Sequence, residues 1–213
     1  MGLTADRTRT LTDRVFCFSL VVWLGLAGCG RSSPARIEAP PLDPAEITTR
    51  VMKELDANGD GTLTRDELLK SPATAAALKS LVPGQGDGIS QEAVRAWLDR
   101  VRASRVAFQS LILTVTHRNR PLASATVRLV PLACMGSSIQ PAEGVSDDNG
   151  TVICSVPGNS FPGVHCGLYR VEITGSGNDG KPLATRHNIE TVHGLAVGDE
   201  VPAGGRAAVT LSP

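Results

Sequence analysis

The spacing of apolar residues changes near position 105, and this change constrains the fold more than any other feature of the chain. Before that point, Ile47, Val51 and Leu55 lie four residues apart, as residues on one face of a helix do. After it, runs such as LYRVEIT place apolar residues at every second position, as half-buried strands do. The sequence therefore predicts a helical part over residues 44–104, followed by a β part over residues 106–213.

Residues that favour helix starts and stops divide the helical part into four short helices. Pro44 suits the first turn of a helix that ends near Leu55, and a second helix begins near Arg65. Ser71 is expected to cap a third helix with its side chain, and a fourth begins after Ser90. The apolar stripe of the fourth helix holds Val94, Trp97, Leu98 and Val101. The pattern is thus a helix, a loop and a helix, twice over.

The first of the two loops, DANGDGTLTRDE, concentrates oxygen-bearing side chains. Asp56, Asn58 and Asp60 lie at alternate positions, Gly61 follows at once, and Glu67 closes the stretch. Carboxylates this close repel one another unless a cation offsets their charge. Ca²⁺ takes about 6 to 8 oxygen ligands, and alternate residues of a tight turn direct their side chains at one centre. The spacing therefore indicates a Ca²⁺ site.

This helix–loop–helix resembles the EF-hand, a Ca²⁺-binding unit. The resemblance implies six ligand positions: Asp56, Asn58, Asp60, Thr62 through its carbonyl, Thr64 through water, and Glu67 through both oxygens. Gly61 matches the glycine at the sharp bend of that loop, and a bidentate Glu67 favours Ca²⁺ over Mg²⁺. The competing interpretation is a polar turn with solvated acidic side chains. That interpretation does not explain why so many positions match the EF-hand pattern.

The second loop, PGQGDGISQEAV over residues 83–94, has lost most of this ligand pattern. Pro83 stands where the first ligand would, and one residue is missing before Ile89. We expect a pseudo-loop with a structural role, in which Ile89 pairs beside Leu63. A weaker Ca²⁺ site that uses Asp87 and backbone carbonyls is the alternative.

Five strand-like runs make up the β part: SLILTVTH, ASATVRLVP, GTVICSV, LYRVEIT and RAAVTLS. Short strands with turn residues between them predict a β-sandwich. The stretches VTHRNRPLASATVRLVP, GVSDDNGTVICSVPG and PGVHCGLYRVEITG resemble the carboxypeptidase-regulatory-like, transthyretin-like sandwiches of secreted bacterial proteins. The resemblance implies a binding, spacing or folding module without catalytic residues. Asp147, Asp148 and Asn149 are expected to form a hairpin turn, with a second Ca²⁺ site as the alternative.

Residues 1–28 have the pattern of a targeting segment, with an arginine-bearing start before the apolar run VFCFSLVVWLGLAG. As a helix this run is too short for a bilayer core of about 30 Å, which favours a signal peptide. It ends in LAGC, which resembles the lipobox of bacterial lipoproteins, and the resemblance implies that Cys29 is lipidated and becomes the first mature residue. An ordinary secretory signal is the alternative. Residues 29–43, rich in Ser, Pro and Ala, predict a flexible tether.

The cysteines of the β part permit one disulfide in a secreted protein, and we favour Cys154 with Cys166 because they flank a short loop. A soft-metal site is the alternative, built from Cys134, Cys154, His165 and Cys166. The sequence has no G-x-S-x-G motif and no glycine-rich phosphate loop, so we do not expect an enzyme. The 21 basic and 21 acidic side chains balance, which gives no general attraction to nucleic acid.

Together these features predict an α+β multidomain protein, an EF-hand pair with a degenerate second loop followed by an all-β Ig-like or transthyretin-like sandwich. We expect a Ca²⁺-binding, membrane-anchored lipoprotein of the cell envelope, outside the cytoplasm, with the outer membrane as one placement. Its expected role is structural or adhesive, with the lipid bilayer and an unknown envelope protein or glycan as partners. A Ca²⁺-responsive regulator of an envelope complex and a soft-metal carrier are the alternatives.

Overall fold

The computed structural model describes four stretches of the chain: residues 38–81, 88–159, 161–198 and 205–211. The predicted signal peptide, Cys29 and most of the tether lie outside these stretches, as does Asp87 of the pseudo-loop. The residues from Ile37 to Pro213 form one compact unit. Within the described stretches, no helix combines the length and the apolar character needed to cross a bilayer.

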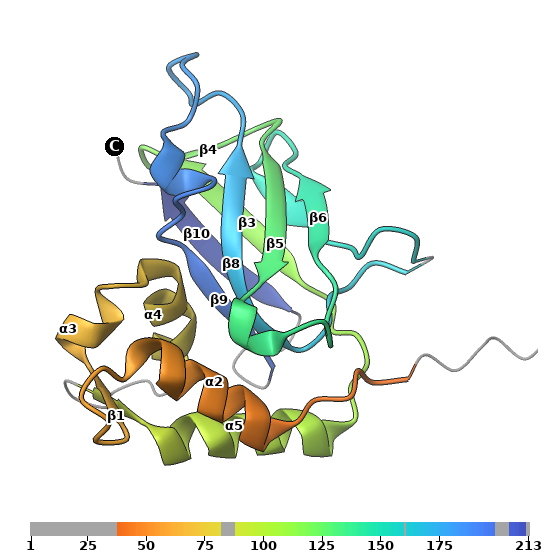
Figure 1. Cartoon of the computed structure of the whole chain (residues 1–213). Coiled ribbons are helices and arrows are strands. Elements are labelled where there is room, and N and C mark those ends of the chain that lie inside the picture. The colour runs from red at the N-terminus through yellow and green to blue at the C-terminus, as the bar shows by residue number, and fades with distance from the viewer. Residues whose placement is uncertain (1–37, 82–87, 160, 199–204, 212–213) are drawn as a thin grey trace, which may run out of the picture. The chain divides into compact units, whose positions relative to one another are not determined.

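The described chain has an α+β fold, with helices in its N-terminal part and most strands in its C-terminal part (Figure 1). All four predicted helices are present. They are α2 (Pro44–Leu55), α3 (Arg65–Leu68), α4 (Pro72–Lys79) and α5 (Gln91–Ser104). Two short 3₁₀ helices, η2 (Ala133–Met135) and η3 (Thr185–His187), lie within the β part.

Polar side chains just before α2 and α5 explain where these helices begin. The Asp43 carboxylate accepts hydrogen bonds from the backbone N–H groups of Ala45 and Glu46. Ser90 accepts one from the backbone N–H of Ala93, as its position before the apolar stripe predicts. Each bond satisfies a donor that the first turn of a helix would otherwise leave without a partner.

The prediction that Ser71 caps α4 with its side chain is wrong. Its hydroxyl forms a hydrogen bond with the Thr74 hydroxyl, 2.8 Å away, and none with the backbone of the helix. Pro72 at the first helical position explains why the helix still begins there, because proline has no N–H group to satisfy and its backbone angle already suits a helix.

The two loops of the helical part meet in a short antiparallel ladder between β1 (Thr62–Thr64) and β2 (Gly88–Ser90). Leu63 lies opposite Ile89 in this ladder, and both side chains are buried in the core. The predicted pairing of these two residues is therefore confirmed. The pairing ties the first loop to the second, whatever the second loop binds.

Eight further strands form two sheets of four (Figure 1). In the first, β3 pairs with β10 on one side and with β4 and β7 on the other; in the second, the order is β6-β5-β8-β9. The first sheet contains β3 (Ile112–His117), β4 (Arg120–Pro121), β7 (Thr151–Ile153) and β10 (Arg206–Leu211). The second contains β5 (Thr126–Pro131), β6 (Ala142–Val145), β8 (Gly167–Thr174) and β9 (Gly194–Val197).

All five strand-like runs of the sequence contain strands, namely β3, β5, β7, β8 and β10. The structure adds β4, β6 and β9, which the sequence did not predict. Alternate residues of β3 and β5 are fully buried, Leu113 and Val115 in one strand and Val127 and Leu129 in the other, and they belong to one hydrophobic core. The Ig-like or transthyretin-like identity of this part stays a prediction, as does the division into two domains.

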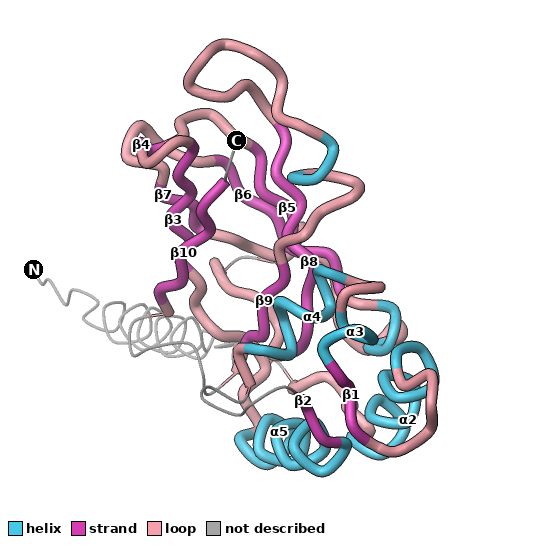
Figure 2. Tube along the Cα trace, turned by 90° about the vertical axis from the view of Figure 1, so that its left-hand side faces the viewer, coloured by secondary structure: helices cyan, strands magenta, loops and turns pink. Residues whose placement is uncertain are grey.

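The helix α4 packs against the second sheet at β8 and β9 (Figure 2). The closest approach is at Gly194, where an added Cβ would lie 1.8 Å from the carbonyl oxygen of Ala73. The inward face of α4 is built from small residues such as Ala73 and Ala77, which allow the helix to come this near. This contact holds α4, the helix that follows the first loop and α3, against the β part.

Candidate metal centre

The first loop begins where α2 ends and closes at α3 (Figure 1). Gly61 has a φ of 80°, a backbone conformation that side-chain-bearing residues rarely adopt. The chain therefore makes its sharp bend at the position that the sequence assigned to a glycine. Thr62, which follows, lies in β1, so that the loop enters the ladder directly after the bend.

Three side chains of the loop fold back onto its own backbone. The Asp56 carboxylate accepts the N–H groups of Gly59 and Gly61, at 2.7 and 2.9 Å. The Asn58 side-chain oxygen accepts the N–H of Asp60, and its amide nitrogen donates to Asp60 Oδ2 at 2.9 Å. These bonds hold the predicted ligands Asp56, Asn58 and Asp60 within one network. Asp60 Oδ1 in turn accepts the N–H of Thr62.

Glu67 closes the loop with four hydrogen bonds. Its Oε1 accepts the backbone N–H groups of Ala57 and Asn58, at 2.8 and 3.3 Å. Its Oε2 accepts both the backbone N–H and the hydroxyl of Thr64, at 2.9 and 2.7 Å. A carboxylate offers about four lone-pair sites, so these bonds engage all of them. Glu67 thus spans the loop from its start to its end.

The surroundings of Glu67 keep it ionised. Its side chain is buried, with 6% of the residue exposed. The backbone N–H of Thr64, the Thr64 hydroxyl and the N–H groups of Ala57 and Asn58 lower the pKa of Glu67 to about 2. Thr64 and Glu67 also form a capping box at the start of α3. The predicted ligand Thr64 therefore has a structural role of its own in this arrangement.

Among the described residues, the carboxylates at the predicted ligand positions pair with no cationic side chain, although Arg65 lies within the same loop. Asp56, Asp60 and Glu67 form no ion pair with a Lys, Arg or His side chain of the described residues, although Arg95 and Arg102 both pair with Asp99 on α5. Across the same residues, no three His, Cys, Asp or Glu side chains converge on a point where a metal could lie. The loop carboxylates instead face N–H groups of the loop.

The donor chemistry of the loop fits Ca²⁺, since every predicted ligand atom is an oxygen. Asp56 and Asp60 each accept two hydrogen bonds, so part of their accepting capacity is left for an ion. Glu67 has no such capacity left, and it could hold an ion only after giving up some of its present bonds. The alternative site at Asp87 lies outside the described residues.

The acidic turn at Asp147 connects strands and makes no cluster of ligands. Its Oδ1 accepts the N–H groups of Asn149 and Thr151, at 2.9 and 2.7 Å, and Gly150 has a positive φ. The turn is present as predicted, and the segments that it joins run antiparallel: Glu143 and Ser155 exchange two backbone hydrogen bonds, and the N–H of Asp147 donates to the carbonyl of Thr151. It joins β6 to β7, which belong to different sheets, so the chain crosses from one sheet to the other here.

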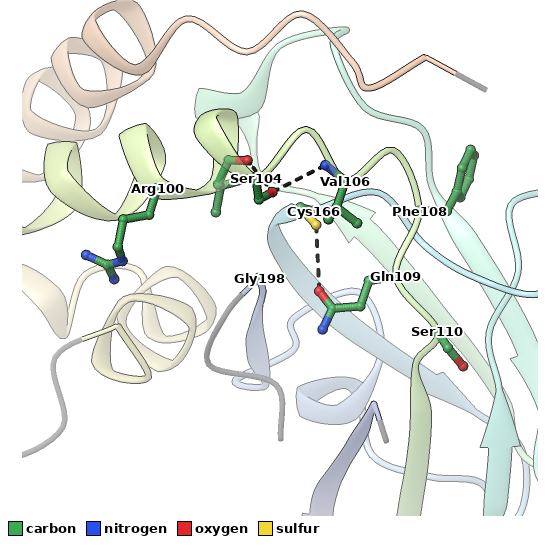
Figure 3. A pocket seen from close by; sticks show the side chains of 9 residues that line it. Arg100, Ser104, Val106, Phe108, Gln109, Ser110, Cys166 and Gly198 are labelled. Carbon is green, nitrogen blue, oxygen red and sulfur yellow. Dashed lines mark hydrogen bonds between the residues drawn. The ribbon is translucent and has the colours of Figure 1, made fainter. Parts of the chain in front are cut away.

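The cysteines of the β part are buried thiols in this structure, and the predicted bridge between Cys154 and Cys166 is absent from the described residues. The Cys166 sulfur donates a hydrogen bond to Gln109 Oε1, 3.7 Å away, at the wall of a cavity of about 450 Å³ (Figure 3). Burial raises the pKa of Cys134 and of Cys154 to about 12, which disfavours the thiolate that a soft metal needs.

The predicted soft-metal ligand His165 is engaged elsewhere. Its Nδ1 lies 3.0 Å from the carbonyl oxygen of Ala107, and its ring stacks at a tilt on Phe108, with 4.2 Å between ring centroids. Burial lowers the pKa of His165, so the ring is neutral near pH 7. No feature of the described structure gathers His165 and the three cysteines into one site.

A pair of histidines that the sequence did not single out lies before β9. His187 Nδ1 and His193 Nε2 are 3.0 Å apart, and the two rings stack with their centroids 5.3 Å apart. His187 is buried and His193 is partly buried. Burial, and then the nearby His187, lower the pKa of His193 to about 4. The six-residue spacing of these histidines in the sequence did not indicate that they are in contact, because the contact depends on how the segment between them folds.

This histidine pair predicts that the protein loses stability in mild acid. Since His193 is neutral in the folded chain and takes up a proton near pH 6.5 when unfolded, stability is complete above pH 6.5 and falls as the pH decreases toward 4. Between pH 7 and pH 5 we expect a loss of about 1 kcal/mol from this residue, after allowing for its partial exposure. Urea unfolding at both pH values measures it, and His193→Gln should remove that part of the loss. An equal loss in both proteins would contradict the assignment.

Comparisons with known proteins return no matching family model, no matching curated protein and no matching solved structure. The resemblances to the EF-hand and to the transthyretin-like sandwiches therefore depend on the residues and contacts described above.

Proposed function

We propose that this chain is a Ca²⁺-binding protein of the cell envelope, anchored by lipid at Cys29, in which one ion at residues 56–67 stabilises the helical part. The proposal is carried by the charge of the predicted ligand carboxylates, which form no ion pair among the described residues. Asp56, Asp60 and Glu67 bring three carboxylates into a single loop, and no cationic side chain of the described residues pairs with them. A bound divalent cation would offset most of that charge.

The ligands would come from both ends of the loop. Asp56, Asn58 and Asp60 supply side-chain oxygens from the first half, and the carbonyl of Thr62 lies just past the bend. Glu67 supplies the last oxygens from the first turn of α3. The ion, when bound, adds a cross-link between the end of α2 and the start of α3. Because Leu63 pairs with Ile89, this cross-link would also restrict the motion of the second loop.

The hydrogen bonds of Glu67 limit the affinity that we expect. To bind the ion, its carboxylate must give up hydrogen bonds to Ala57, Asn58 or Thr64. Each lost bond makes the free energy of ion binding less favourable. We therefore expect a dissociation constant of about 10⁻⁴–10⁻³ M, the range of extracellular modules of this kind. An ion of this affinity suits a structural role where Ca²⁺ is abundant.

The same contacts favour a second candidate, a Ca²⁺-responsive regulator of an envelope complex. Glu67 belongs to the capping box of α3, so an ion and the helix start compete for one carboxylate. Ion binding would then alter the first turn of α3. A dye that reports exposed apolar surface separates the two roles: a Ca²⁺-dependent signal favours the regulator, and a constant signal favours the structural role. In both, the β part would contact the partner, an envelope protein or a glycan.

Calorimetric titration of residues 37–213 with CaCl₂ tests the proposal, because this segment lacks the signal and the lipid site and forms one compact unit. We expect saturation at one ion per chain, with weaker binding of Mg²⁺. Absence of Ca²⁺ binding up to about 10 mM, ten times the weakest expected dissociation constant, would overturn it. The lipid site needs its own test, mass spectrometry of the membrane-extracted protein with and without a Cys29→Ala substitution.

A further inference from the structure

We propose that a groove along α4 binds a short, extended segment of a partner protein that combines aliphatic and acidic side chains. The proposal goes beyond ion binding, and it is tested at constant Ca²⁺ because Arg65 belongs both to the groove and to the loop. The groove, of about 300 Å³, lies where α3 and α4 meet the segment that precedes β9. We call it the α4 groove, and its apolar walls are Leu68, Leu69, Pro72, Ala76 and Val192.

The α4 groove gathers exposed apolar side chains from distant parts of the sequence. Leu69 is 65% exposed and Val192 is 41% exposed, and both line the groove. Large exposed apolar side chains on one surface carry a cost in water that burial against a partner removes. Leu69 follows α3 and Val192 precedes β9, so the fold brings them together. The Gly194 contact that seats α4 on the second sheet also places Val192 beside this helix.

One whole face of α4 forms the floor of the groove. The lining residues Pro72, Ala76 and Lys79 recur at helical spacing, together with Ala75. The opposite face, with Ala73 and Ala77, packs toward Gly194 of the second sheet. From Pro72 to Lys79 the helix rises about 10 Å, at 1.5 Å per residue. An extended peptide of about three residues covers that length, so the groove suits a chain better than a compact molecule.

Charge selects an acidic partner. Arg65 and Lys79 line the groove and both are exposed, and none of the described residues that line it is acidic. Neither cation forms an ion pair or side-chain hydrogen bond with another described residue, whereas Arg50 pairs with Glu46 and Arg118 with Asp179. Two cations that pair with no acid in the described part of the chain lie beside an apolar floor, and together they complement carboxylates next to aliphatic side chains. A flat bilayer surface would not fill a hollow of this shape.

Two labelled peptides test the proposal on the full chain in detergent, at constant Ca²⁺. The first is Asp-Leu-Val-Asp-Leu and the second is Lys-Leu-Val-Lys-Leu, and binding is followed by fluorescence anisotropy. We expect saturable binding of the acidic peptide at one site, and binding of the basic peptide at least about tenfold weaker. Equal binding of both peptides, or no binding of the acidic one, would overturn the proposal.

Matched substitutions locate the binding. Leu69→Asp should weaken the acidic peptide at least about tenfold, because it places a carboxylate among the apolar walls. Its control is Ile189→Asp, at a side chain that is 76% exposed but does not line the groove. Arg65→Glu should weaken the same peptide, whereas Lys70→Glu, just past the end of α3 and outside the lining, should not.

All four substitutions lie at exposed positions, so unfolding midpoints should stay close to the parent value and show that the variants are folded. Equal weakening by Leu69→Asp and by Ile189→Asp would contradict the assignment to this groove. The protein can also be sedimented with vesicles of phosphatidylglycerol. If it bound these vesicles through Leu69 and did not bind the acidic peptide, the groove would be a membrane contact, and the proposal would be overturned.

Discussion

Replacing Glu67 with glutamine should weaken Ca²⁺ binding by at least about 100-fold, the upper end of what is lost when only a supporting group of a metal site changes. The amide keeps one oxygen, which can still accept the N–H groups of Ala57 and Asn58. It loses the charge and the second oxygen, and its NH₂ group would direct hydrogen atoms toward the ion. Calorimetric titration of residues 37–213 measures the change.

The matched control is Asp66→Asn, one residue earlier. Asp66 carries the same charge, is exposed, and occupies no predicted ligand position. It should change the affinity only through its exposed charge, by a small factor that salt reduces further. If both variants lost the same affinity, general electrostatic attraction would explain the binding. If Glu67→Gln bound as tightly as the parent, the assignment of this loop would be wrong.

Replacing Gly194 with alanine should destabilise the protein by at least about 3 kcal/mol, the upper part of the range for overpacked cores. The added Cβ would lie 1.8 Å from the carbonyl oxygen of Ala73 and 2.7 Å from the backbone nitrogen of Ala77. Both are backbone atoms of α4, so the whole helix would have to move off the second sheet. Urea unfolding of the parent and the variant gives the difference in free energy.

Gly167→Ala is the control for this result, because its crowded neighbours can move. Gly167 lies on β8, beside β9, and an added Cβ there would lie 2.5 Å from Ile139 Cδ1 and 3.1 Å from Met135 Cε. These are the ends of flexible side chains, so we expect a loss of about 1 kcal/mol, the lower end of the range for overpacking. A cost at Gly194 no greater than that at Gly167 would show that α4 is not held as the structure places it.

Local sequence preferences predicted the helices and five of the eight strands in the two four-stranded sheets, because their causes lie within a few residues. Ser90 starts α5 through a bond to Ala93, three residues away, and this is readable from the sequence alone. The pairing of Leu63 with Ile89 was also predictable, since it follows from the match between two loops. The capping prediction at Ser71 failed because a second hydroxyl, on Thr74, competed for the same side chain.

Contacts between distant segments could not be predicted in this way. The short strand β9 has only four residues, and it is a strand because β8 lies beside it. The histidine pair and the α4 groove depend on how the segment before β9 folds, and nothing local marks Val192 as a neighbour of α4. At the candidate metal centre, the residue types were predictable. The commitment of Glu67 to four hydrogen bonds was not, because it depends on backbone N–H groups at both ends of the loop.

The parallel pairing of β10 with β3 has a consequence for how the chain is made. These strands lie side by side although the paired residues Thr116 and Thr210 are 94 positions apart in sequence. A ribosome must therefore finish almost all of the β part before β3 receives this neighbour, and until then one edge of β3 is open to wrong partners. If the chain is exported as proposed, this late pairing would help to keep it unfolded while it crosses the membrane.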